Sequence, residues 1–127
     1  MQKTIINTAG APAPIGPYSQ AVQAGGMLFI SGQVAIVPAT GELVTSSIQD
    51  ETIQVMENLA ALLKAAGCGF QQVIKTTIFL SDMALFARVN EVYATYFTGD
   101  YPARETVAVK GLPKNANVEI SMIAVIP

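Results

Sequence analysis

The chain has 127 residues, of which 51% are hydrophobic and 13% charged, with a net charge of −2 and a pI of about 4.9. This composition excludes a disordered chain, and its acidic balance argues against a nucleic-acid-binding surface, which needs basic residues. The chain has no histidine and one cysteine, Cys68, so Ser-His-Asp and Cys-His catalysis are excluded and a zinc site is disfavoured. Any chemistry must depend on carboxylates, the two arginines, lysine, tyrosine, hydroxyl groups, the backbone and water.

No apolar run reaches the roughly 18 residues of a membrane span, and the N-terminal MQKTIINTAG lacks the apolar core of a secretion signal. One cysteine cannot form an internal disulfide, so we expect a reducing, cytoplasmic location. The length suits one domain over residues 1–127. The high apolar content indicates further buried surface in an oligomer.

The first third of the chain predicts strands. Three strand-like runs cover residues 4–7, 21–24 and 27–33, and Gly25-Gly26 between the second and third predicts a tight hairpin. The proline-rich stretch 11–17 cannot be a central strand, and 38–41 predicts a turn.

The clearest helix is predicted over residues 47–66. Ser46 or Ser47 can cap its start, its first turn is acidic, and Gly67 is placed to end it. Apolar residues recur at helical spacing: Ile48, Val55, Leu59, Leu62, Leu63 and Ala66.

The second half continues with a β-branched strand over 73–80 and a helix that Asp82 can cap, reaching about Phe97. Two further strands are expected over 105–109 and 117–126. The order β-β-β-α-β-α-β-β predicts an α+β fold, with two helices on one face of a mixed sheet. The last strand is apolar on both faces, with Ile123 and Val125 on the second face. That face therefore needs cover from sheet closure or from another subunit.

Arg104 and Glu119 are the strongest candidates for chemistry. Arg104 opens a strand, and its planar guanidinium suits a small carboxylate, although a surface arginine in a salt bridge is the commoner explanation of such a residue. Glu119 lies within the most apolar strand, where a carboxylate needs a partner or a function, unless it faces solvent at the strand start. If their strands are neighbours, the two side chains would form a cation–carboxylate pair.

Weaker candidates surround these two. Tyr18 follows the stiff APAPIGP segment, which can present a hydroxyl or simply leave the ring on the surface. Ser31 and Gly32 interrupt an apolar strand, which indicates a bulge, a close backbone approach or a strand end. Asn90 lies mid-helix beside the apolar stripe, where a buried amide would need partners. Cys68 suits a small, inert turn residue.

Together these candidates resemble the RidA/YjgF family. The segment PARETVAVKGLPKNANVEI, residues 102–120, is similar to the family signature: Pro-Ala-Arg, an alternating strand, Leu-Pro, a short loop and an apolar-Glu-Ile. The resemblance extends over nearly the whole chain, through IGPYSQAV, LFISGQVAIVPATGELV, NLAALLKAAG, VIKTTIFLSDMALFARVNEVYATYF and the closing IAV.

The resemblance implies a chorismate-mutase-like α+β fold, assembled as a homotrimer with active sites between subunits. Similar members are 2-iminobutanoate/2-iminopropanoate deaminases, which remove imines released by pyridoxal-phosphate-dependent serine and threonine dehydratases and need no cofactor or metal. By position, Arg104 matches the arginine that binds the substrate carboxylate, and Glu119 matches the acidic residue placed by the reactive carbon. Residues matched to the lining of the same cleft are Tyr18, Ser31, Gly32, Asn90 and Thr106.

Two departures from the family pattern bear on substrate preference. Glu105 replaces a usually small residue and should point away from the face of Arg104, whereas Thr106 replaces a frequent cysteine and shares that face. We expect imine hydrolysis with 2-imino and 2-keto acids as ligands, and no nucleic-acid or membrane partner. The alternatives are a non-catalytic carboxylate-binding regulator or chaperone-like protein, and an endoribonuclease, against which the acidic pI and missing histidine argue.

Overall fold

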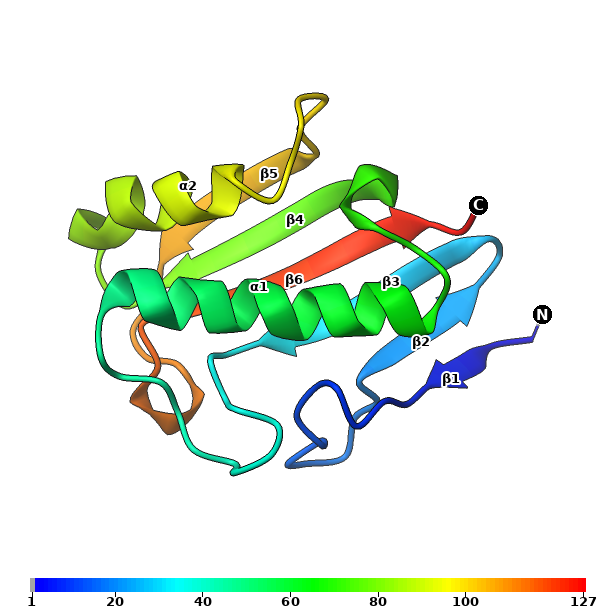
Figure 1. Cartoon of the computed structure of the whole chain (residues 1–127), viewed down its shortest axis with the longest axis horizontal. Helices are drawn as coiled ribbons and strands as arrows, with labels where there is room; N and C mark the ends of the chain where they lie inside the picture. The colour runs from blue at the N-terminus through cyan, green and yellow to red at the C-terminus, as the bar shows by residue number, and fades with distance from the viewer. Residues whose placement is uncertain (1) are drawn as a thin grey trace.

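The computed structural model describes residues 2–127 and contains one six-stranded sheet in the order β1-β2-β3-β6-β4-β5. Two helices lie across one face of this sheet (Figure 1). The elements are β1 (Thr4–Ile6), β2 (Ala21–Ala24), β3 (Met27–Gln33), α1 (Ile48–Ala65), β4 (Val73–Leu80), α2 (Phe86–Ala94), β5 (Ala103–Ala108) and β6 (Val118–Val125). Only β4 and β5 pair in parallel, so the sheet is mixed and the predicted α+β class and element order are confirmed.

The predicted positions of the first hairpin and the first helix are confirmed. Gly25 and Gly26 both have positive φ, 57° and 75°, as a two-residue turn between right-twisted strands requires. Ser47 caps α1, because its hydroxyl accepts a hydrogen bond from the Asp50 N–H at 3.0 Å. Gly67 follows α1 with φ 76°.

The second helix is shorter than predicted. Asp82 caps a 3₁₀ turn, Met83–Leu85, and α2 begins only at Phe86. It ends at Ala94 rather than Phe97, because the N–H groups of residues 95–97 bond to carbonyls three residues back, as in a 3₁₀ turn. Strand β5 begins at Ala103, two residues earlier than predicted, which places Arg104 inside the strand.

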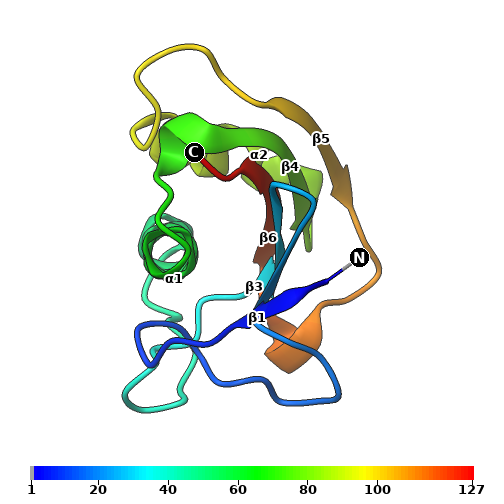
Figure 2. The same cartoon turned by 90° about the vertical axis from the view of Figure 1, so that its right-hand side faces the viewer.

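The core lies between the helices and the sheet. Val118, Ile120, Met122 and Ala124 of β6 are almost fully buried there against α1. Within residues 2–127, neither α1 nor α2 lies over the opposite sheet face, here called the open face (Figure 2). Its register-aligned side chains include Phe29, Val107, Ile123 and Val125, with Phe29 45% and Val107 46% exposed. The predicted second apolar face of the last strand is therefore present and uncovered in the single chain.

Among residues 2–127, no helix is both long and apolar enough to cross a membrane.

Candidate functional site

Arg104 is held in a defined orientation on β5. It pairs with Thr76 of β4, whose side chain lies under the helices, so Arg104 also projects toward the helix layer. Its Nη1 donates a hydrogen bond to Asn90 Oδ1 of α2 at 2.7 Å. The guanidinium carbon lies 5.6 Å from the ring centre of Phe86 and 5.2 Å from that of Tyr93. Two cation–π contacts and one hydrogen bond thus leave the remaining N–H groups free to bind an anion.

Tyr93 links Arg104 to the core. Its hydroxyl lies 2.9 Å from Thr76 Oγ1 in a buried hydrogen bond, and the side chain is 4% exposed. Burial raises the pKa of Tyr93, while the Thr76 hydrogen bond and the Arg104 charge lower it, so the phenol stays neutral. The cavity beside them has a volume of about 300 Å³ and is lined by Asn90, Tyr93, Ala94, Tyr101, Pro102 and Arg104. We call it the arginine pocket.

Glu119 lies in a second cavity, on the open face. It pairs with Phe79 of β4, three residues beyond Thr76, so alternation turns its side chain away from the helices. The carboxylate is partly buried, and desolvation raises its pKa above the usual range. Among residues 2–127 no hydrogen bond or ion pair to the Glu119 carboxylate is formed. A partly buried, unpaired carboxylate with a raised pKa is suited to proton transfer.

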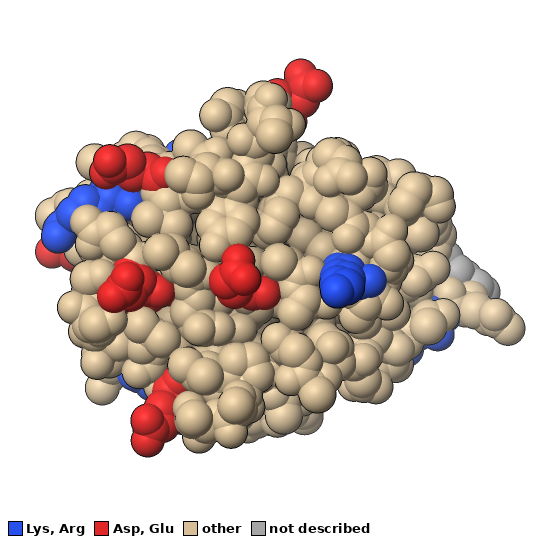
Figure 3. All heavy atoms as spheres, viewed as in Figure 1, with Lys and Arg blue, Asp and Glu red and all other residues tan. Residues whose placement is uncertain are grey.

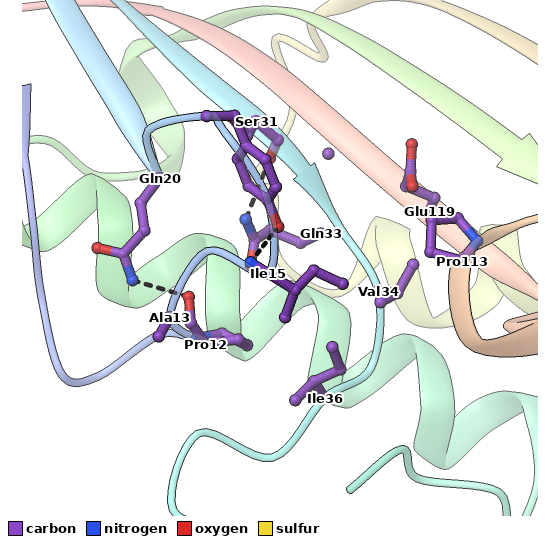
Figure 4. Close-up of a pocket in the computed structure, with 12 residues that line it drawn as sticks. Pro12, Ala13, Ile15, Gln20, Ser31, Gln33, Val34, Ile36, Pro113 and Glu119 are labelled. Atoms are coloured by element: carbon purple, nitrogen blue, oxygen red, sulfur yellow. Dashed lines mark hydrogen bonds between the residues drawn. The ribbon is translucent and has the colours of Figure 1, made fainter. Parts of the chain in front are cut away.

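The Glu119 cavity has a volume of about 390 Å³ and is largely apolar (Figure 4). We call it the glutamate pocket. Ile15, Val34, Ile36 and Pro113 line it together with the polar residues Tyr18, Ser31 and Glu119. Buried Asn58 of α1 donates hydrogen bonds to the carbonyls of Val34 and Ile36. These bonds hold two apolar residues that line the glutamate pocket in place.

Ser31 and Gly32 form a bulge in β3 beside Glu119. Ile30 pairs with Met122 and Gln33 with Ile120, so three steps along β3 match two along β6. Ser31 Oγ donates to the Ser19 carbonyl at 2.6 Å, which joins the bulge to the loop carrying Tyr18. The bulge interpretation of this Ser-Gly pair is therefore confirmed.

The loop that carries Tyr18 is held by a residue that sequence reasoning missed, Gln20. Its side-chain amide donates to the carbonyls of Thr8, Ala11 and Pro12, and its Oε1 accepts from the Thr8 N–H at 2.8 Å. Gln20 is 3% exposed, and its side chain supplies the hydrogen bonds that a proline-rich loop cannot make itself. The Tyr18 hydroxyl accepts a 3.3 Å hydrogen bond from the Ile15 N–H at the pocket edge. No sequence signal separates Gln20 from other loop glutamines.

One sequence expectation is wrong. Arg104 and Glu119 do not lie on neighbouring strands and form no ion pair, because β4 lies between β5 and β6 and the two side chains project from opposite faces. The predicted site residues therefore fall into two groups. Arg104 and Asn90 meet in the arginine pocket, whereas the glutamate pocket brings together Tyr18, Ser31, Gly32 and Glu119.

The two departures at positions 105 and 106 behave as alternation predicts. Glu105 lies on the open face and forms a 3.1 Å salt bridge with Lys75. Hydrogen bonds from Lys75 and Thr77 lower the pKa of Glu105. Thr106 pairs with Ile78 and shares the face of Arg104. Its Oγ1 is buried without a hydrogen-bond partner among the described residues.

Among residues 2–127, Cys68 lines neither pocket. Burial raises the pKa of the Cys68 thiol, which keeps it protonated and a poor nucleophile, in agreement with an inert turn residue. Within residues 2–127 no three His, Cys, Asp or Glu side chains are grouped so that they could hold a metal ion.

Comparison with known proteins assigns the chain to a family. Residues 8–126 match the family model described as Endoribonuclease L-PSP. A mouse protein named 2-iminobutanoate/2-iminopropanoate deaminase is 50% identical over 123 residues, which cover 97% of this chain and 91% of the mouse protein. The chain therefore belongs to the RidA/YjgF family, as its motifs indicated.

Solved structures agree with this assignment. A Rid family protein from Yersinia pestis, YyfA, superposes with a TM-score of 0.96 at 47% identity, covering 98% of this chain and 100% of the other. Escherichia coli TdcF, solved with bound serine, has a TM-score of 0.92 at 43% identity, covering 96% and 98%. The YjgF-like fold is thus shown by both sequence and structure.

Proposed function

We propose that this protein hydrolyses 2-imino acids, such as 2-iminobutanoate and 2-iminopropanoate, to 2-keto acids and ammonia. The observation that carries the proposal is the pair of complementary half-sites. The arginine pocket offers a preoriented cation for a carboxylate, and the glutamate pocket offers an unpaired carboxylate among apolar residues. The deaminase name of the mouse relative supports the same reaction.

We further propose that each active site forms between two copies of the chain within a homotrimer. Arg104 and Glu119 of one chain face away from each other, so a single small substrate can reach both only if they come from different copies. The exposed apolar side chains of the open face, such as Phe29 and Val107, offer a surface for such assembly. Closed cyclic symmetry would give three equivalent sites.

The mechanism begins with orientation of the substrate. Arg104, held by Asn90 and the two aromatic rings, binds the substrate carboxylate through its free N–H groups. Thr106, beside it on the same face, and Tyr18 and Ser31 at the other pocket complete the lining. Binding at the carboxylate fixes C2 next to Glu119 of the neighbouring copy, so water attack becomes a positioned step.

Glu119 then acts as the general base. It takes one proton from water as the oxygen bonds to C2, and the imine nitrogen takes a second proton from solvent, giving a neutral carbinolamine. As the C–N bond breaks, the carbinolamine hydroxyl returns one proton to solvent, and the proton on Glu119 passes to the departing nitrogen directly or through water. One imine and one water become one keto acid and one ammonia, and Glu119 returns to its starting state.

A trapping assay tests this function. A pyridoxal-phosphate-dependent threonine dehydratase acting on L-threonine supplies 2-iminobutanoate, and semicarbazide traps it as a semicarbazone that absorbs in the ultraviolet. We expect the protein to slow semicarbazone formation in proportion to its concentration. Arg104→Ala should abolish this effect. Arg88→Ala is the matched control, because Arg88 is exposed on α2 and lines neither pocket.

Absence of any effect with imines derived from both threonine and serine would contradict the proposal. It would favour the second candidate, a carboxylate-binding protein without turnover, which the bound serine in TdcF supports. Titration of 2-ketobutyrate by calorimetry then measures that binding directly.

Endoribonuclease activity, the name carried by the family model, has less physical support in this chain. Charged groups are scattered over the face in Figure 3 rather than gathered in a basic patch, and the net charge is −2. Ribonuclease activity that persists through repurification and is lost in Arg104→Ala would reverse this judgement.

A further inference from the structure

We propose that Gly32 is a positioning residue: by lacking a side chain, it leaves the space in which the Glu119 carboxylate lies against the β3 bulge, facing the glutamate pocket. This inference rests on the proposed function, in which Glu119 is the base. It adds that Gly32 determines where the Glu119 carboxylate lies.

The space at Gly32 is filled by Glu119 itself. A Cβ built on Gly32 would lie 2.6 Å from Glu119 Oε2, 2.8 Å from Cδ and 3.1 Å from Cγ. The two contacts shorter than 3.0 Å, to Oε2 and Cδ, are closer than non-bonded atoms come, so one partner must move. All three atoms belong to the outer part of one flexible side chain. The carboxylate would therefore move while the strands stay in place.

The backbone conformation does not itself require glycine at this position. The glycines with positive φ are 25, 26, 41, 67 and 99 among residues 2–127, and Gly32 is not one of them. An alanine would thus fit the backbone of the bulge without strain in φ. The three atoms nearest to a Cβ added here all belong to the Glu119 side chain.

Little else in the chain holds the Glu119 carboxylate where it is. Among residues 2–127 it has no hydrogen-bond partner, and Tyr18 is the other titratable side chain lining the glutamate pocket. The carboxylate occupies the space that a Cβ on Gly32 would take, so the bulge bounds it on that side. Partial burial at that position also raises the pKa of Glu119, so a displaced carboxylate would become better hydrated and more acidic.

The direct test is Gly32→Ala, with Gly111→Ala as the matched control. A Cβ on Gly111 meets no atom within 4 Å, and Gly111 also lacks a positive φ. We expect Gly32→Ala to lower kcat by about 10- to 100-fold, the usual effect of a displacement near 1 Å, with KM nearly unchanged. The melting temperature should stay close to that of Gly111→Ala, which should keep full activity.

A second readout reports the carboxylate without depending on turnover. A pH titration of side-chain-labelled glutamate by ¹³C NMR, with the Glu119 signal assigned from Glu119→Gln, should show a lower pKa in Gly32→Ala than in wild type. An unchanged pKa together with unchanged kcat would overturn the inference.

Double variants separate this inference from the proposed function. If Gly32 acts through Glu119, Gly32→Ala should add no further loss in a Glu119→Gln background, and independent, multiplying losses would contradict it. Full activity of Glu119→Gln alone would instead refute the base assignment, while the NMR titration would still decide the position of the carboxylate. If Gly32→Ala fails to fold, adding Glu119→Ala removes the conflicting atoms and must restore folding, or the inference is wrong.

Discussion

Arg104 and Glu119 of the same chain project from opposite faces of one sheet, on strands β5 and β6 that β4 separates. The register makes this unambiguous, because Arg104 pairs with Thr76 and Glu119 with Phe79, three residues apart on β4. The cation and the carboxylate that the proposed reaction needs thus belong to two different pockets of the chain.

Mixing two inactive variants should restore activity. Arg104→Ala keeps an intact glutamate pocket, and Glu119→Gln keeps an intact arginine pocket. In trimers assembled at random from equal amounts of both, about one quarter of the inter-subunit sites receive both intact residues. We expect roughly that fraction of wild-type activity in the trapping assay after co-refolding. No recovery in mixed trimers of confirmed composition would mean that each chain supplies both residues to the same site.

A charge on the open face should prevent assembly. Phe29 is 45% exposed there, and Phe29→Asp would place a carboxylate in an interface that must otherwise be apolar. We expect sedimentation to show monomers and the imine-trapping activity to fall by at least about 100-fold, because sites between copies cannot form. Ile53→Asp, at 43% exposure on α1, is the control that should remain assembled and active.

The ring of Tyr93 should matter for substrate binding and its hydroxyl for stability. Tyr93→Leu removes a cation–π contact with Arg104, worth about 0.5–2 kcal/mol, so KM should rise about 2- to 30-fold. Tyr93→Phe keeps the ring but loses the hydrogen bond with Thr76, which should lower the unfolding free energy by about 1 kcal/mol with KM unchanged. Equal KM effects in both variants would show that the contact with Arg104 is not the cause.

Activity should be lost as the pH is lowered, with a midpoint above 4.5, the usual pKa of a glutamate. Burial raises the pKa of Glu119, and a general base must be deprotonated, so kcat should fall as pH drops through this raised value. The effect on stability has the opposite sign. Because the folded-state pKa is raised, the contribution of Glu119 to stability is present below its unfolded pKa and is lost as pH rises through the folded value.

It follows that Glu119→Gln should unfold at a slightly higher temperature than wild type at pH 7, while being impaired in turnover. Calorimetry at pH 4 and pH 7 measures this, and the difference between the two proteins should be larger at pH 7. A variant that is less stable than wild type at pH 7 would show that the carboxylate has a stabilising partner in the assembly.

A buried carboxylate on α1 should stabilise the segment that leads into β6 and Glu119. Glu51 is 1% exposed, and its two oxygens accept hydrogen bonds from the backbone N–H and the side-chain amide of Asn117, at 2.7 and 3.0 Å. Glu51→Ala leaves both donors without this partner. We expect it to lower the free energy of unfolding, measured by chemical denaturation, by about 2–3 kcal/mol. Glu91→Ala, an exposed carboxylate on α2, should change stability by less than about 0.5 kcal/mol.

Local features of the chain could be predicted from the sequence because each depends on residues close together in the chain. The positive φ of Gly25 and Gly26, the cap by Ser47 and the alternation of β6 depend on residues a few positions apart. The predicted end of α2 is wrong because residues 95–97, which follow it, form 3₁₀ hydrogen bonds. The spacing of apolar residues does not distinguish such a turn from an α-helix.

The candidate residues Arg104 and Glu119 were also identified from the sequence, through their chemistry and the family motif that contains them. Their relation in space was not. The sequence predicts eight elements in order, but β6, the last strand, inserts between β3 and β4 in the sheet, and only long-range pairing decides that. The same pairing brings Gly32 against Glu119, 87 positions apart, and leaves Arg104 on the far face. Residue types and the family motif were enough to indicate a candidate chemistry, because both lie in the local sequence. Tertiary structure decided that Arg104 and Glu119 lie in two separate pockets of one chain, because only long-range strand pairing sets which face each side chain occupies.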